Sequence, residues 1–555
     1  MNKRTKKGYF TKRILCAGSV AIIFTVSFPL VALAETAVPK PGESLRGTQP
    51  PRQNVSVENV DKAAGKQGTE SVRFTLTEIR VEHEGIKVKD EEICAITRII
   101  VGKEIDAEEL NATIRNVTRY LRSHGYPAAA AYIPEQTAVD GKLLVKVEPG
   151  RLGKVQLDNG SGLKDKAAER LLAGLKPGEI IRTRKLENAL YNLRDLSGVD
   201  VQGVLSPGAE TGTSDLTVQV SNKKKTSIIL YAENYGSKSA GRYRYGLQGE
   251  VRNLSGNGDR MNLGVLISNE KQHNYNIAYE TTWGRSASKL GIGFSRADYE
   301  LGSVFAALGA EGIANTYSIF GRTPLWNTSN SGLAVTYGFD YRDIKDELKQ
   351  FDVSWKKHSY VFHVGLDGMQ RGSKTSVQYN ATLFTGKLVP DSDVADTLAT
   401  LGRTKGHFTK ATADVMVVQD LSKNFDLFFK LSGQKAANNL DSSEHIYLGG
   451  ARGVRAYPHG EASGDEGILG TLELRYHTPV KGLVLSTYFD AGHVRMEKEV
   501  NGGMTLKGWG IGLTYSKPND WFARFDYARR IGSDPDMSDE ARSRQRMWFI
   551  AGKVF

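Results

Sequence analysis

The chain has 555 residues, and 74 Lys and Arg against 62 Asp and Glu give it a formal net charge of +12 at pH 7. Six of the positive charges precede residue 14 and the others are interspersed with acidic residues, so no basic block indicates nucleic acid binding. Beyond residue 34, no run approaches the roughly 20 apolar residues of a transmembrane helix. A helical membrane protein is therefore excluded. A transmembrane barrel is not, because its strands are apolar on one face only.

The first 34 residues have the layout of a secretory signal peptide. Basic residues precede an apolar run over 14–33, and the small residues Ala32 and Ala34 favour cleavage before Glu35. An uncleaved anchor is the alternative. We expect a signal peptide over 1–34, and hence a protein exported from the cytoplasm.

The segment 35–72 is predicted to be a linker. It holds four prolines among Gly, Ser, Gln and charged residues, with few large apolar side chains to bury. The pattern over 55–64 leaves room for a short helix within this linker.

The segment that follows is predicted to form two copies of one small α+β unit, over 73–148 and 149–222. In the first copy, Asp106 and Glu109 can cap a helix with one apolar face, and an alternating strand follows Gly141. The same pattern returns about 72 residues later, which indicates tandem modules. The apolar positions of the repeat are Leu110, Ile114, Val117, Leu121, Leu143, Val145 and Val147, and then Leu186, Leu190, Leu193, Leu216, Val218 and Val220.

From 223 to 555 the sequence alternates with a period of two, which puts successive side chains on opposite faces of a strand. One face is apolar and often aromatic, and the other is polar or charged. This pattern is typical of a transmembrane barrel with a wet lumen. Allowing ~20 residues for each strand and its connection, we expect about sixteen antiparallel strands. The alternative, a soluble β-sandwich, would require several domains joined by linkers.

The carboxyl terminus has the form of a final barrel strand that the barrel assembly machinery reads. Phe555 shares one face of this strand with Phe549 and Ala551, whereas Lys553 on the same face departs from the pattern. We therefore expect an outer-membrane protein that contacts lipid and depends on this machinery for its assembly.

Catalytic and cofactor motifs are missing from the sequence. It contains no H-E-x-x-H, no G-x-S-x-G and no phosphate loop of the form G-x-x-x-x-G-K-[ST]. Cys94 is the only cysteine after residue 34, so neither an intramolecular disulfide nor a cysteine zinc site can form. His459 and His477 stand near the segment described next, but lone histidines are usually structural or solvated. We expect no enzyme activity, no cofactor and no metal.

A glycine-rich segment lies at 449–467, between two predicted barrel strands. At its centre stand Gly453, Val454, Arg455, Ala456 and Tyr457. This segment resembles the signature loop of the BamA-like superfamily, and more closely that of the TpsB transporters of two-partner secretion. In that family a long extracellular loop folds back into the barrel and carries V-R-G-[YF]. Ala456 replaces the usual glycine, at a cost of about 1 kcal/mol if this position needs a positive φ.

A second motif of the TpsB family, [FG]-x-D-x-G on a barrel strand, resembles the segment from Tyr488 to Gly492, with tyrosine at the first position. The resemblance implies that Asp490 faces the lumen and that Arg455 reaches it. A guanidinium paired with a carboxylate would be a directional, charge-assisted contact.

The resemblance extends over the rest of the chain. The units at 73–148 and 149–222 are similar to two POTRA domains, and 253–259 is similar to an early turn of the TpsB barrel. A plug helix often precedes the linker in that family, but about 35 residues are too few for a full plug.

The family resemblance implies a function in protein secretion. An unfolded TpsA-type exoprotein would be recognised by POTRA domains in the periplasm and would pass through the outer-membrane barrel. An adhesin, a cytolysin and a haem scavenger all remain open as its cargo. A BamA-type insertase and a passive porin are the rival functions.

Overall fold

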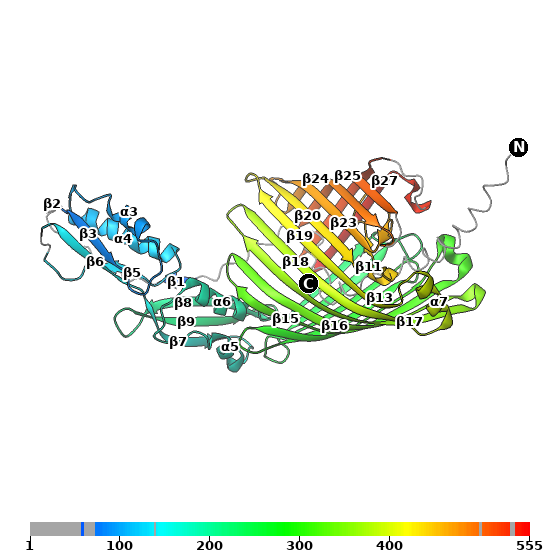
Figure 1. Ribbon diagram of the computed structural model, residues 1–555, viewed down its shortest axis with the longest axis horizontal. Helices are drawn as coiled ribbons and strands as arrows, with labels where there is room; N and C mark the ends of the chain where they lie inside the picture. Colours follow the sequence, from blue (N-terminus) through cyan, green and yellow to red (C-terminus); the bar gives the residue numbers. More distant parts are fainter. Residues whose placement is uncertain (1–56, 60–72, 138–139, 499–501, 533–538) are drawn as a thin grey trace.

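The computed structural model describes residues 57–59 and 73–555, except 138–139, 499–501 and 533–538. The signal peptide expected at 1–34 and all of the linker except 57–59 therefore lie outside the described residues. Two α+β units extend from one end of a large barrel (Figure 1). Among the helices of the described part of the chain, none is long and apolar enough to cross a membrane.

The first α+β unit is built on one well-capped helix packed against small sheets. The Asp106 carboxylate accepts a hydrogen bond from the Glu109 amide at 2.9 Å, and Glu109 accepts one from the Asp106 amide at 3.1 Å. This capping box starts helix α4, whose predicted apolar face is buried, as expected. The elements are β2 (Phe74–Thr75), β3 (Glu78–Glu82), α3 (Asp90–Thr97), β4 (Glu104–Ile105), α4 (Ala107–Ser123), β5 (Ala130–Tyr132) and β6 (Lys142–Glu148).

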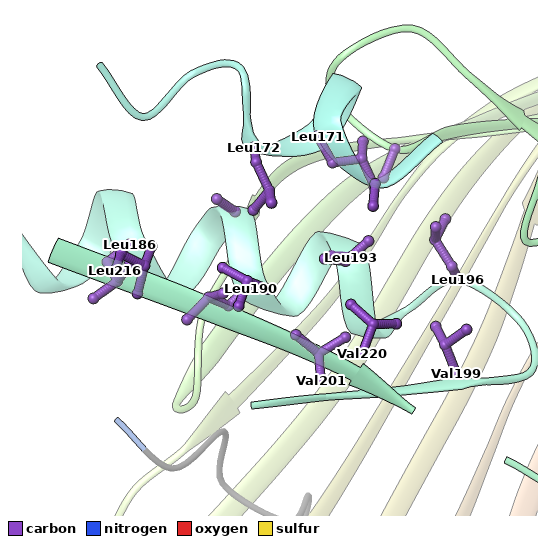
Figure 2. Close-up of a cluster of buried hydrophobic side chains, with 14 of the residues drawn as sticks. Leu171, Leu172, Leu186, Leu190, Leu193, Leu196, Val199, Val201, Leu216 and Val220 are labelled. Atoms are coloured by element: carbon purple, nitrogen blue, oxygen red, sulfur yellow. The ribbon is translucent and has the colours of Figure 1, made fainter. Parts of the chain in front are cut away.

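The second α+β unit packs two helices on a sheet of order β1-β8-β9-β7. The repeated leucines of α6 meet Leu216 and Val220 of β9 in its core, as Figure 2 shows. The short helix left open over 55–64 is not formed at residues 57–59, which are instead a strand that pairs in parallel with β8. The elements are β1 (Val57–Asn59), β7 (Arg151–Asn159), α5 (Asp165–Leu172), α6 (Thr183–Arg194), β8 (Val199–Pro207) and β9 (Thr213–Asn222).

The remainder of the chain forms a closed antiparallel barrel of 16 strands, which confirms the expected number. The strands of the wall are β10 (Thr226–Glu233), β11 (Arg244–Arg252), β12 (Arg260–Ser268), β13 (His273–Trp283), β14 (Ser288–Glu300), β15 (Ala310–Asn327), β16 (Ser331–Leu348), β17 (Val353–Arg371), β18 (Thr375–Pro390), β19 (Gly406–Asp420), β20 (Phe425–Ala436), β23 (Glu466–His477), β24 (Leu483–Arg495), β25 (Gly503–Ser516), β26 (Trp521–Arg530) and β27 (Gln545–Val554).

Shorter elements lie in the connections between the wall strands. Helix α7 (Asp393–Leu401) joins β18 to β19, and the two-residue strands β21 (Ile446–Tyr447) and β22 (Ser463–Gly464) lie between β20 and β23. The 3₁₀ turns are η1 (Ser303–Leu308), η2 (Lys349–Phe351), η3 (Ser442–Glu444) and η4 (Asp539–Arg542).

The outer face of the barrel is apolar, as the alternation predicts. Tyr245 and Leu247 on β11, and Leu263 and Val265 on β12, are all exposed on the outside of the wall. Neighbouring inward positions carry polar groups. Arg244 on β11, for example, is buried and bonds Glu233 on β10 at 2.5 Å. Apolar residues therefore cover the outside of the wall while charged residues pair inside.

The last strand closes the barrel against the first. Residues 550–554 of β27 pair with 229–233 of β10, and the Phe555 amide donates to the Ile228 carbonyl at 2.8 Å. Phe555 is exposed on the outer face, and the Lys553 ammonium lies 5.2 Å from the centre of its ring and 3.8 Å from an Asp520 oxygen. Lys553 thus covers apolar surface with its stem and pairs its charge at the rim.

The second α+β unit is bound to the turns at its end of the barrel. The Asn327 amide donates to Asn188 Oδ1 at 2.8 Å, and its side chain donates to Asp195 at 2.7 Å. Two residues further on, in the turn itself, the Ser329 hydroxyl donates to Glu187 at 2.9 Å. Helix α6 and its end thereby fix this unit to the β15–β16 turn, so the long β20–β23 connection opens at the opposite end of the barrel.

Candidate functional site

The longest described connection of the barrel, residues 437–465, joins β20 to β23 and lies inside the wall. Strands β21 and β22 pair and thereby join the two limbs of this loop, the one that leaves β20 and the one that enters β23. Buried Asp465 accepts hydrogen bonds from the backbone amides of Leu440 at 2.9 Å and Lys498 at 2.8 Å. The loop was expected over 449–467, but residues 466–467 belong to β23, because the alternating barrel pairing already begins there.

The motif residues at the loop tip are buried against the inner wall. Val454 and Ala456 have no exposed surface, and 2% of Tyr457 is exposed. They pack in one apolar cluster with side chains of the loop and of β24, β25 and β26, namely Leu448, Tyr488, Val494, Leu506 and Ala528. The tip is therefore not a solvated loop end but part of the packed interior of the barrel.

Arg455 and Asp490 are brought together, as the family resemblance implied. Arg455 donates from Nη2 to Asp490 Oδ1 at 2.8 Å and from Nε to Oδ2 at 2.8 Å, and its backbone amide also donates to Oδ2 at 3.1 Å. Asp490 has no exposed surface, and Arg455 is 5% exposed. Two parallel charge-assisted bonds fix both the position and the plane of the guanidinium.

Two further carboxylates surround the same guanidinium, and neither stands in a family motif. Arg455 Nη1 lies 3.3 Å from Glu473 on β23 and 3.2 Å from Asp526 on β26. The guanidinium also stacks on the Tyr488 ring, with 3.1 Å between the guanidinium carbon and the ring centre. We call Arg455 with Asp490, Glu473 and Asp526 the tip anchor. It joins the loop to three wall strands at once.

Wall arginines balance the negative charge of the tip anchor. Arg524 donates to Asp526 at 2.7 Å and to Glu473 at 3.2 Å, and Arg475 donates to Glu473 at 3.2 Å. Three arginines and three carboxylates thus form one buried network. The alternation along β26 puts Arg524 and Asp526 on its polar, lumenal face, but their pairing partners on other strands do not follow from the pattern of one strand.

The glycine of the strand motif makes room for the loop. A Cβ on Gly492 would lie 3.0 Å from a methyl group of Leu448, which is itself completely buried. Gly453 makes a comparable close approach inside the loop, because a Cβ there would lie 2.0 Å from the Leu448 carbonyl oxygen. Close packing around Leu448 therefore requires glycine at 453, where a Cβ would meet backbone, and leaves little room for a side chain at 492.

Ala456 does not have a positive φ, so the strain considered for it does not arise. The backbone of the loop tip is also tied to the last strand of the barrel, because the Trp548 indole donates to the Arg455 carbonyl at 2.6 Å. No motif pointed to Trp548 beforehand. The alanine in place of glycine is thus compatible with a firmly docked tip.

The two histidines near the motif have different surroundings. His477 on β23 bonds Asp426 at 2.5 Å, at the edge of the arginine network. His459 lies in the buried tip segment, where its ring is next to Gly450. Over the residues that the structure describes, no group of three or more His, Cys, Asp or Glu side chains could hold a metal ion. Cys94 is exposed on α3.

Comparison with known proteins identifies the family. The model of the haemolysin secretion/activation proteins ShlB/FhaC/HecB matches residues 212–515, more than half of the chain, and the model of the ShlB-type POTRA domain matches residues 74–150. The heme/hemopexin transporter protein HuxB of Haemophilus influenzae strain 86-028NP is 26% identical over 97% of this chain and 98% of its own. The outer membrane transporter CdiB of Dickeya dadantii is 21% identical over 80% of each chain.

Solved structures show the same fold. CdiB from Escherichia coli superposes with a TM-score of 0.69 and 18% identity over 97% of this chain and 99% of its own. BamA from Haemophilus ducreyi, crystallised without POTRA domains 1–3, gives 0.52 and 15% over 87% of this chain and 100% of its own. This chain therefore belongs to the haemolysin secretion/activation family of outer-membrane transporters, with a 16-stranded barrel and POTRA domains in the periplasm.

Proposed function

We propose that this protein secretes one large TpsA-type exoprotein, which its POTRA domains recognise unfolded in the periplasm and its barrel passes to the outside. The observation that carries the proposal is the loop held inside the lumen by the tip anchor. A passive porin has no need of periplasmic modules or of a buried arginine network that fastens a movable loop across its pore.

Recognition in the periplasm is proposed to use the edges of the POTRA sheets. Strand β5 ends the three-stranded sheet of the first POTRA unit. An extended client can pair with such an edge through backbone hydrogen bonds, which give affinity with little demand on sequence. Side-chain contacts beside the edge would then select the cargo.

Transport itself needs the loop to leave the path of the cargo. The sequence contains no phosphate loop for a nucleotide. We propose that folding of the exoprotein outside the cell supplies the pull, and that the tip anchor defines the closed position of the loop. Lipids of the outer membrane surround the barrel, and the barrel assembly machinery inserts it.

The test replaces Arg455 by Ala and measures the exoprotein released from cells that produce this chain together with its TpsA-type partner. We expect secretion to fall strongly, because three buried carboxylates lose their shared cation. Arg452→Ala is the matched control, since Arg452 is an exposed arginine in the same loop. Both variants must show wild-type amounts of heat-modifiable barrel. Unchanged secretion by the Arg455→Ala variant would contradict the proposal.

A BamA-type insertase is the second candidate, because the fold of BamA superposes on most of this chain. The two functions differ in what depletion does. Loss of an insertase lowers the amounts of many outer-membrane proteins, whereas loss of a secretion transporter leaves them unchanged and retains one exoprotein inside the cell. We expect the second result.

A further inference from the structure

The lumenal loop is fastened to the wall at a second place, well away from its tip in sequence. Asp441 and Glu444, on and beside the 3₁₀ turn η3, carry two carboxylates into a group of wall cations. These cations are Arg342 on β16, Lys357 on β17 and Lys410 on β19. None of these strands contributes to the tip anchor.

The pairs in this second group are short and buried. Arg342 donates to Glu444 at 2.7 Å, and the Lys410 ammonium lies 2.9 Å from the other Glu444 oxygen. Lys357 donates to Asp441 at 2.7 Å. Arg342 and Glu444 are each 2% exposed. Pairs this well shielded from water are weakened little by salt, unlike ion pairs on a surface.

The loop backbone is held at the same place. Lys410 donates to the Glu444 carbonyl at 2.9 Å, and Gln434 donates to the carbonyls of Glu444 at 2.8 Å and Asp465 at 3.0 Å. Gln434 therefore bridges both limbs of the loop where they leave the wall. Side chains and main chain together fix this part of the loop.

Glycines separate the two fastened parts of the loop. On one limb Gly450 has a φ of 121°, and on the other Gly460 has a φ of 83°. Both lie between the short β21–β22 ladder and the tip. Because glycine has the least restricted backbone, these are the two positions at which the limbs can change direction with the least strain.

From this arrangement we infer that Asp441 and Glu444, with Arg342, Lys357 and Lys410, form a stem anchor that keeps the loop in the lumen when the tip anchor opens. The tip then swings on the glycines, and the stem stays in place throughout transport. The inference rests on the proposed function only in treating this loop as the closure of the pore.

The test measures single-channel conductance of purified protein in planar bilayers, without any exoprotein. Three variants are compared: Arg455→Ala, the stem variant Asp441→Asn/Glu444→Gln, and all three changes together. Because either anchor alone should retain the loop, the channel should open only briefly in the two variants that have lost one anchor. The combined variant should stay open about tenfold longer than either, because two attachments that act in parallel give a non-additive effect when both are removed.

A control variant and a second set of substitutions distinguish loss of the stem anchor from misfolding of the barrel. Glu347→Gln removes one carboxylate of the exposed Lys345–Glu347 pair on β16 and should leave every opening time unchanged. Lys357→Met/Lys410→Met removes two of the three wall cations of the stem anchor and should reproduce the stem variant when combined with Arg455→Ala. Equal opening times for Arg455→Ala and for both combined variants would overturn the inference, whatever secretion assays give.

Discussion

Ala456 of the loop tip and Gly508 of β25 face each other so closely that a Cβ on Gly508 would lie 2.6 Å from the Cβ of Ala456. The side chain of Ala456 is completely buried at this contact. The methyl group that replaces the usual glycine of the loop motif is thus matched by the absence of a side chain on the wall.

This pairing predicts a compensatory double substitution. Gly508→Ala should destabilise the docked tip by about 1–3 kcal/mol, the usual cost of inserting a methyl group into a packed interior. Adding Ala456→Gly removes the opposing methyl group and should restore most of the loss. Urea unfolding in lipid vesicles measures both variants.

The control for this cycle is Ala456→Gly alone. It should cost less than Gly508→Ala, because it removes a methyl group and strains nothing. If the double variant proved as unstable as Gly508→Ala alone, Gly508 would be required for a reason other than its contact with Ala456.

Arg455→Lys tests whether geometry, and not charge alone, holds the tip. Lysine keeps the positive charge but cannot span both Asp490 oxygens while also reaching Glu473 and Asp526. We expect the variant to lose about 3–5 kcal/mol, toward the cost of breaking a buried pair. Release of the tip from the wall, with the rest of the loop still held, should be visible as faster cleavage by protease added to intact cells.

The matched control is Arg529→Lys on β26, whose side chain is exposed on the outer face of the same wall sector. Protease cleavage of this variant should equal that of the wild type. Equal protection of the Arg455→Lys loop would mean that a single positive charge suffices for the tip anchor.

Much of the fold could be predicted from the sequence because its signals are local or periodic. The Asp106 and Glu109 cap, the leucine spacing of α6 and the alternation of the barrel strands each depend on a few neighbouring residues. The strand at 57–59 could not be predicted in this way. Its pairing with β8 joins residues more than 140 positions apart, and nothing in three residues specifies a distant edge.

The same limit applies to the candidate site. The contact between Arg455 and Asp490 was expected only because both residues stand in motifs of a known family. Glu473 and Trp548 are ordinary members of alternating strands, so their convergence on Arg455 depends on the closure of the whole barrel. The stem anchor has the same origin, since its cations come from three separate strands.

The bond between the second POTRA unit and the barrel leads to another prediction. Asn327→Ala removes side-chain hydrogen bonds to buried Asn192 on α6 at 3.3 Å and to half-buried Asp195, the C-cap of α6, at 2.7 Å. We expect a loss of about 1–3 kcal/mol at this contact and a more mobile POTRA unit. The distribution of distances between spin labels on α6 and on the barrel rim should broaden.

Asn330→Ala in the same turn is the control, because Asn330 is exposed. Its distance distribution should match that of the wild type. A sharp, unchanged distribution for Asn327→Ala would assign the docking of this unit to its other contacts, such as the Ser329 bond to Glu187.

The periplasmic turn after β11 depends on a buried carboxylate. Burial alone would raise the pKa of Asp259, but hydrogen bonds from the Ser255 hydroxyl at 2.7 Å and its amide at 3.0 Å outweigh this and hold the pKa below its ordinary value of 3.8. A carboxyl group whose pKa is lower in the folded than in the unfolded state stabilises the fold at pH values above its unfolded-state pKa. This stabilisation is lost as the pH falls through the lowered pKa of the folded state.

Asp259→Asn should therefore destabilise the protein by about 1.5–3 kcal/mol at neutral pH, the range for hydrogen bonds to a charged group. The difference from wild type should shrink as the pH falls below 3.8, because protonated aspartate resembles asparagine as an acceptor. Thermal unfolding of both proteins from neutral pH to below pH 3.8 measures this difference in stability. Asp158→Asn is the control, because Asp158 is exposed and its substitution should change stability little. A gap between wild type and Asp259→Asn that stayed constant down to the lowest pH would mean that the turn depends on the shape of the side chain and not on its charge.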